Sequence, residues 1–156
     1  MLRVSRLLRG SAALTELCNG VTAEFGGDGR RINGGGCIDW AERVMELAAR
    51  SDLDMLDLES NFFAANAEDS YEGYPDGNGE FGFSLRSLQE YNSPVPPGLS
   101  AEEVASPLFA SCFAHHAWVW DPAAKLHYDA ECCQGVGSLF ELPMHKRALA
   151  RYMQKR

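Results

Sequence analysis

Basic residues are scarce in this sequence. Lysine and arginine together number 14 against 22 acidic residues, which gives a net charge of −8 at pH 7. Duplex nucleic acids and anionic membrane surfaces attract basic proteins, so we expect neither as a partner. Long apolar runs are missing as well, and none approaches the roughly 20 residues that a membrane-spanning helix needs.

Cysteine is also infrequent, and its pattern does not suit a secreted protein. There are five cysteines, an odd number, and Cys132 and Cys133 are adjacent, whereas secreted disulfide frameworks use an even number of spaced cysteines. The first 20 residues contain three arginines and lack the uninterrupted apolar core of a secretory signal. An Arg-rich transit peptide is the alternative interpretation of this start. We expect a cytoplasmic protein with free thiols, located in the host cytoplasm if a phage encodes it.

A length of 156 residues, with 46% hydrophobic residues, suits one globular domain over residues 1–156. Apolar spacing predicts a helix over 4–19, and Asn19-Gly20 is a typical helix end, so the N-terminal helix is expected within 1–20. Val21–Phe25 is compatible with a short strand. The glycine-rich segment 26–36 is a loop by composition.

The sequence "NGGGCIDWAERVMELAAR" places Cys37 at the start of a predicted helix, Cys37–Arg50. Its apolar stripe is expected to comprise Ile38, Ala41, Val44, Met45 and Ala48, with Trp40 and Leu47 widening it. At a helix N-terminus, free N–H groups and the helix dipole stabilise a thiolate, and the same N–H groups can hold an oxyanion. The alternative is a small, inert, buried cysteine.

The middle of the chain is acidic and irregular. Residues 51–60 are compatible with either a strand or a short helix, and residues 66–98 are expected to form an acidic loop region rich in glycine and proline. Ser100, followed three residues later by Glu103, has the spacing of a capping box that begins a helix. Residues 142–156 are predicted to form a short basic helix.

Two strand-like segments, Phe109–Trp120 and Leu126–Cys133, flank the turn sequence "DPAAK" and predict a hairpin. If the loop is the four residues 121–124, Trp120 faces Lys125 and His116 lies directly opposite Asp129 on the same face. If the loop is one residue longer, Asp129 faces Ala117 instead, and His115 becomes its diagonal neighbour. The sequence leaves both registers open.

A thiol at a helix start, a histidine base and a carboxylate that orients the histidine form the nucleophile, base and orienting acid of acyl transfer. Cys37, His116 and Asp129 can take these roles if the helix packs on the hairpin. This chemistry needs no cofactor and no metal, and its substrate would be a peptide or another amide. The oligomeric state is not indicated.

The motifs "GGGCIDWA" and "HAWVWDPAAKLHYDAE" resemble the papain-like cysteine peptidase superfamily, and more closely its small bacterial and phage members. The superfamily includes peptidases, amidases, cell-wall hydrolases of the NlpC type and acyltransferases. The resemblance implies an α+β fold in which N-terminal helices pack on a small antiparallel sheet, with a Cys37, His116 and Asp129 triad. In papain a glutamine several residues before the cysteine serves as oxyanion donor. The side-chain amide nearest to that position in this sequence is Asn33, which the resemblance therefore suggests for the role. Gly36 and Trp118 are further candidates for contact with the oxyanion or substrate.

Two other interpretations remain open. A zinc site would draw on residues of the types that bind this ion, and its candidates are Cys112, His115, His116, Cys132 and Cys133. However, strand alternation separates Cys112 from His115, and no Cys-x-x-Cys pair is present, so we expect no metal. The alternative function is a non-catalytic acidic binding or inhibitor protein on the same fold, encoded by a phage or a bacterium.

Overall fold

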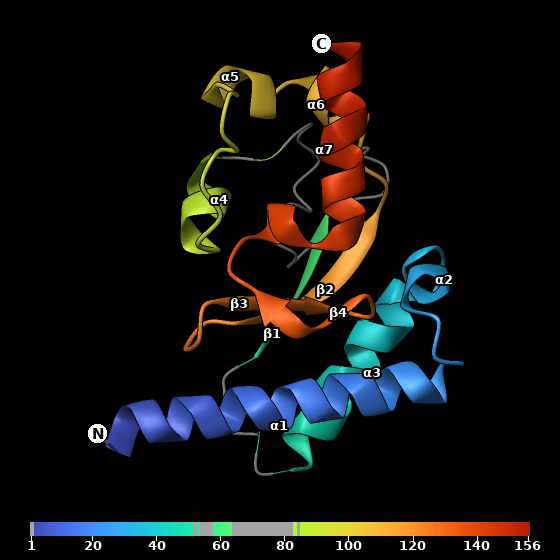
Figure 1. The fold of residues 1–156 in the computed structure, drawn as a ribbon, viewed down its shortest axis with the longest axis vertical. Coiled ribbons are helices and arrows are strands. Elements are labelled where there is room, and N and C mark those ends of the chain that lie inside the picture. The colour runs from blue at the N-terminus through green and yellow to red at the C-terminus, as the bar shows by residue number, and fades with distance from the viewer. Residues whose placement is uncertain (1, 52, 54–57, 64–82, 84) are drawn as a thin grey trace.

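The computed structural model describes residues 2–51, 53, 58–63, 83 and 85–156, and these form a mixed α+β fold. Figure 1 shows three layers: the long N-terminal helix and the helix that follows the glycines on one side, the sheet in the middle, and the C-terminal helices on the other side. The helices are α1 (Leu2–Glu24), α2 (Gly29–Asn33), α3 (Cys37–Ala49), α4 (Leu85–Glu90), α5 (Ala101–Val104), α6 (Pro107–Ala110) and α7 (Pro143–Lys155). The strands are β1 (Glu59–Phe63), β2 (His116–Asp121), β3 (Leu126–Asp129) and β4 (Cys132–Val136).

Helix α1 continues through Asn19-Gly20, so the predicted helix end and the predicted strand Val21–Phe25 are both wrong. Tertiary contacts outweigh the local turn signal here. Val21 is buried, and the Thr22 hydroxyl accepts a hydrogen bond from the Trp40 indole at 2.9 Å. The helix ends where Gly26 and Gly27 adopt positive φ angles of 100° and 82°, which glycine tolerates without strain.

Helix α3 begins at Cys37 as predicted. Its buried face includes Trp40, Ala41, Val44 and Ala48, whereas Ile38, predicted to be part of the stripe, is 36% exposed. The preceding segment, predicted as loop, contains the short helix α2, which the Asp28 side chain caps.

The sheet is antiparallel throughout, with strand order β1-β2-β3-β4. Two predicted strands are shorter than expected. Phe109 belongs to helix α6, so β2 begins only at His116. The return strand ends at Asp129 and turns at Ala130-Glu131, so Cys132 and Cys133 lie on the next strand.

Each sheet face carries its own hydrophobic cluster. Helices α1 and α3 cover the face that contains Ala117, Val119 and Tyr128. On the other face, Trp118 packs with residues of α4 to α7, including Phe109 and Tyr152. Within the described part of the chain, no helix has the length and apolar character needed to cross a membrane.

The remaining predictions concern the middle and the C-terminus. The Ser100–Glu103 capping box is confirmed at the start of α5, and the predicted C-terminal helix is confirmed as α7. Strand β1 forms at the end of the segment 51–60 and beyond it. Of the predicted loop region 66–98, residues 66–82 and 84 lie outside the described residues, and α4 occupies part of the remainder.

Candidate active site

Cys37 is the first residue of α3, directly after the N-capping Gly36. The backbone N–H of Trp40 donates to the Gly36 carbonyl at 2.9 Å, which closes the first turn of the helix. By helix geometry, the N–H groups before Trp40 have no acceptor within the helix, and they leave positive potential around the thiol. Cys37 is 8% exposed, so its surroundings are largely dry.

His116 opens β2 and Asp129 ends β3, and both side chains are completely buried. The His116 Nε2 lies 2.9 Å from the Asp129 Oδ2, within a hydrogen bond that a carboxylate accepts from a ring N–H. The other ring nitrogen, Nδ1, makes no hydrogen bond to any of the residues that the structure describes. The carboxylate therefore fixes the ring and leaves Nδ1 for other chemistry.

Neither of the two predicted hairpin registers is correct. Trp120 faces His127 and Asp121 faces Leu126, so the loop is 122–125, with Lys125 at a φ of 55°. The four-residue-loop prediction paired Trp120 with Lys125, so the observed pairing is shifted by two residues along β3. Because strand side chains alternate with a period of two, the shift keeps His116 and Asp129 on one face. The two residues meet diagonally instead of directly opposite one another.

The His116 ring and the Cys37 thiol are electrostatically coupled. Burial alone would raise the pKa of the Cys37 thiol, but hydrogen bonding and charge from His116 lower it, helped by the N–H groups of Ala117 and Ile38. Burial alone would lower the pKa of His116, but Asp129 and Cys37 raise it to about 9. Among the described residues, His116 Nδ1 has no partner that meets the full geometry of a hydrogen bond, so the two groups interact without an ideal bond between them. Both shifts favour the thiolate and imidazolium pair.

Three of the other thiols differ from Cys37. Burial raises the pKa of Cys18 and of Cys133, and it raises that of Cys132 to about 11. These residues are held as neutral thiols in the two hydrophobic clusters. Thiolate character is needed for nucleophilic attack, so the structure sets Cys37 apart.

The three residues suggested for oxyanion or substrate contact have other partners. The Asn33 amide nitrogen donates to Glu131 at 3.0 Å, so a role in an oxyanion hole stays a prediction for its second N–H. The Gly36 N–H donates to the Ile32 carbonyl at 2.6 Å and is therefore not free to meet an oxyanion. Trp118 is 1% exposed and donates its indole N–H to His127, so it is a core residue and no substrate platform.

Glu131 and Arg147, which the sequence did not single out, support the site through their contacts with Asp129 and with each other. Glu131 donates its backbone N–H to the Asp129 Oδ1 at 2.9 Å, and its carboxylate binds Arg147 of α7. The short spacing from Asp129 to Glu131 is the one available signal, because an aspartate often accepts the N–H two residues later. Nothing in the sequence pairs Glu131 with Arg147.

The residues considered for zinc are not brought together. Cys132 lies in the cluster with Trp118, whereas Cys133 lies in the cluster on the opposite face. Among the side chains that the structure describes, no group of three or more His, Cys, Asp or Glu residues could hold a metal ion.

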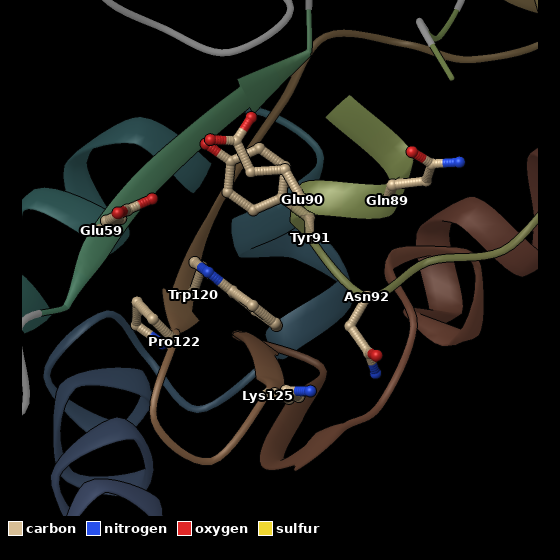
Figure 2. Close-up of a pocket in the computed structure, with 8 residues that line it drawn as sticks. All are labelled: Glu59, Gln89, Glu90, Tyr91, Asn92, Trp120, Pro122 and Lys125. Carbon is tan, nitrogen blue, oxygen red and sulfur yellow. The ribbon is translucent and has the colours of Figure 1, made fainter. Parts of the chain in front are cut away.

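A separate surface pocket lies toward the far end of β2 from His116 (Figure 2). Trp120 forms one wall and Tyr91, from the segment after α4, lies beside it at a ring separation of 5.7 Å. Trp120 is four residues along the strand from His116, or about 13 Å at roughly 3.3 Å per residue. The residues that line this pocket do not include Cys37, His116 or Asp129.

No protein-family model, curated protein or solved structure matches the chain.

Proposed function

We propose that this protein is a papain-like cysteine hydrolase that cleaves an amide or related acyl bond through Cys37, His116 and Asp129. The supporting observation is the buried His116 ring, bound at Nε2 by Asp129 and electrostatically coupled to a thiol of lowered pKa at a helix start. Acyl transfer by a thiol requires this combination of nucleophile, base and orienting acid.

The reaction proceeds in two halves. The Cys37 thiolate attacks the acyl carbon, a C–S bond forms, and the carbonyl π electrons move to the oxygen. When the tetrahedral intermediate collapses, the C–N bond breaks and the His116 Nδ1–H gives its proton to the leaving amine. Water then attacks the thioester, His116 takes one of its protons, and the thiolate leaves as the carboxylic acid forms. Asp129 keeps the proton on Nε2 throughout, so that Nδ1 is the nitrogen that exchanges protons.

Backbone groups at the start of α3 are suited to the developing oxyanion. The first N–H groups of a helix lack acceptors within the helix and point along the positive end of its dipole. They stand beside the Cys37 sulfur because Cys37 is the first helical residue.

The test is the pH dependence of iodoacetamide labelling at each cysteine, followed by peptide mass analysis. We expect Cys37 to label well below pH 8.5, the ordinary range of a free thiol, and well before the four other cysteines. His116→Ala should return Cys37 to the ordinary pH dependence. Slow, similar labelling of all five thiols would contradict the proposal.

A chromogenic ester then tests acyl transfer itself. With p-nitrophenyl acetate, the wild type should release a burst of nitrophenolate matching the protein concentration, and the acetyl group should be found on Cys37. Cys37→Ala should abolish the burst. The second candidate, a non-catalytic acidic binding protein, is favoured by the net charge of −8; it predicts no burst and no acetylated Cys37.

A further inference from the structure

Glu131 occupies the two-residue turn Ala130-Glu131, between the end of β3 and the start of β4. Its backbone N–H donates to the Asp129 Oδ1 at 2.9 Å, while the Asp129 Oδ2 faces His116. The carboxylate of the proposed triad therefore uses one oxygen for the base and the other for this turn. Any shift of the turn moves the acid.

The Glu131 side chain is held firmly in its own charge network. Arg147 donates to both carboxylate oxygens, at 2.9 and 2.8 Å, and the Glu131 side chain is 13% exposed. Burial alone would raise the pKa of Glu131, but the hydrogen bonds from Arg147 and Asn33 and the charges of Arg147 and Arg30 lower it. Two parallel bonds from a guanidinium fix the direction of a carboxylate as well as its charge.

The same carboxylate reaches the segment that leads to the nucleophile. Its Oε2 accepts the Asn33 amide N–H at 3.0 Å, and Asn33 is a buried residue four positions before Cys37. The backbones also touch, because a Cβ added to Gly29 would lie 2.3 Å from the Ala130 carbonyl oxygen. Helix α2 thus packs directly on the Ala130-Glu131 turn.

We propose that Glu131 is a positioning residue that sets the spacing between the thiol of Cys37 and the ring of His116. It links the segment before the nucleophile, through Asn33, to the turn that holds Asp129, and Arg147 of α7 holds the link in place. Glu131 touches no reacting atom. This inference rests on the proposed function, since it assigns a role within the same site.

The substitution Glu131→Gln tests the link with little change in shape. It removes the carboxylate that holds both Asn33 and Arg147, and a small displacement of a reacting group costs up to about 100-fold in rate. We expect labelling of Cys37 at pH 6 to fall about 10- to 100-fold, and the pH midpoint of labelling to rise. Labelling at high pH, where every accessible thiol is ionised, should stay close to the wild type.

Two further variants separate positioning from loss of stability. Asn33→Ala cuts the link at its other end and leaves the Glu131–Arg147 pair intact, so it should raise the midpoint as well. The double variant Asn33→Asp with Glu131→Gln restores an amide-to-carboxylate hydrogen bond of reversed polarity and should recover part of the shift. The matched control is Glu103→Gln, which breaks the 2.8 Å pair with Arg156 at the end of α7. It should leave the labelling midpoint unchanged.

The outcomes distinguish the two proposals. If wild-type Cys37 labels like an ordinary thiol, both the hydrolase and the positioning role are wrong. If the wild type shows the low midpoint and Glu131→Gln and Asn33→Ala keep it while lowering only the melting temperature, the positioning role alone is overturned.

Discussion

His116 and His127 lie on the neighbouring strands β2 and β3, and both are completely buried on the same face of the sheet. Their surroundings have opposite effects. Asp129 and Cys37 raise the pKa of His116 to about 9, whereas burial lowers that of His127 to about 4. His127 accepts the Trp118 N–H at Nδ1. Its Nε2 donates to the Tyr91 carbonyl at 2.8 Å and lies 3.4 Å from the Ser93 hydroxyl, so its partners are all neutral.

Burial alone therefore does not decide the charge of these histidines. A neutral ring with only neutral partners is a satisfied structural element, and protonating it would break the bond from Trp118. A ring between a carboxylate and a thiol gains from protonation and is suited to moving protons. His145 supports this distinction, because burial and the charge of His116 lower its pKa to about 3.

The largest expected effect comes from removing the carboxylate that distinguishes the two rings. Asp129→Ala leaves a buried His116 without its counter-charge, and breaking a buried pair in this way costs about 3–5 kcal/mol. The pKa of His116 should fall, because burial is then opposed mainly by Cys37. Urea unfolding at pH 7 measures the loss of stability. A change below about 1 kcal/mol would show that Asp129 and His116 are not coupled.

The neutral histidines predict a steep loss of stability in acid. His127 and His145 have pKa values of about 4 and about 3 when folded, but 6.5 is the ordinary value, so the unfolded chain binds more protons between these limits. Their contribution to stability is present above pH 6.5 and is lost as the pH falls. Each of the two rings contributes at most about 1.36 kcal/mol per pH unit, so the unfolding free energy should fall by roughly 2 to 3 kcal/mol per unit near pH 5.

His116 adds nothing to that slope, because it is protonated in both states below pH 6.5. Its raised pKa gives stability that is present below pH 6.5 and lost as the pH rises through about 9. Urea titrations at pH 7, 6, 5 and 4.5 check the acid side. A slope below about 1 kcal/mol per unit would contradict the neutral state of His127 and His145.

The smallest effect is expected from Ser93, which lies beside the neutral His127 ring. Ser93→Ala removes the hydroxyl that accepts the Leu139 N–H at 2.8 Å, and leaving this buried donor unpaired costs about 1–3 kcal/mol. The Tyr91 carbonyl still binds His127, so the ring should stay neutral. The pH profile of Cys37 labelling should not move. A shifted profile would mean that the two histidines are not functionally separate.

The helix of the site could be predicted from the sequence, since the 3.6-residue apolar period and the preceding glycines both place its start at Cys37. Of the two registers that the sequence left open, the one with the four-residue loop placed His116 and Asp129 on one face, which is where the structure has them. The register could not be predicted, because a shift of two residues preserves every face and only the turn geometry distinguishes the options.

Contacts between distant segments were not visible in the sequence. Helix α1 continues past Asn19-Gly20 because Val21 and Thr22 pack on the rest of the domain, which local propensity does not reveal. The Glu131–Arg147 pair joins a turn to α7, and only the folded chain brings the two residues together. The same holds for Asn33, whose partner Glu131 lies 98 residues away in the sequence.

The most direct test of the account is a pH titration of the imidazole nitrogens by ¹⁵N NMR in the wild type. We predict that His116 stays protonated through pH 7 and titrates near 9, whereas His127 and His145 stay neutral down to about pH 4 and 3. A His116 that loses its proton at or below pH 6.5, as the other two buried rings do, would contradict the thiolate and imidazolium pair on which the proposed function depends.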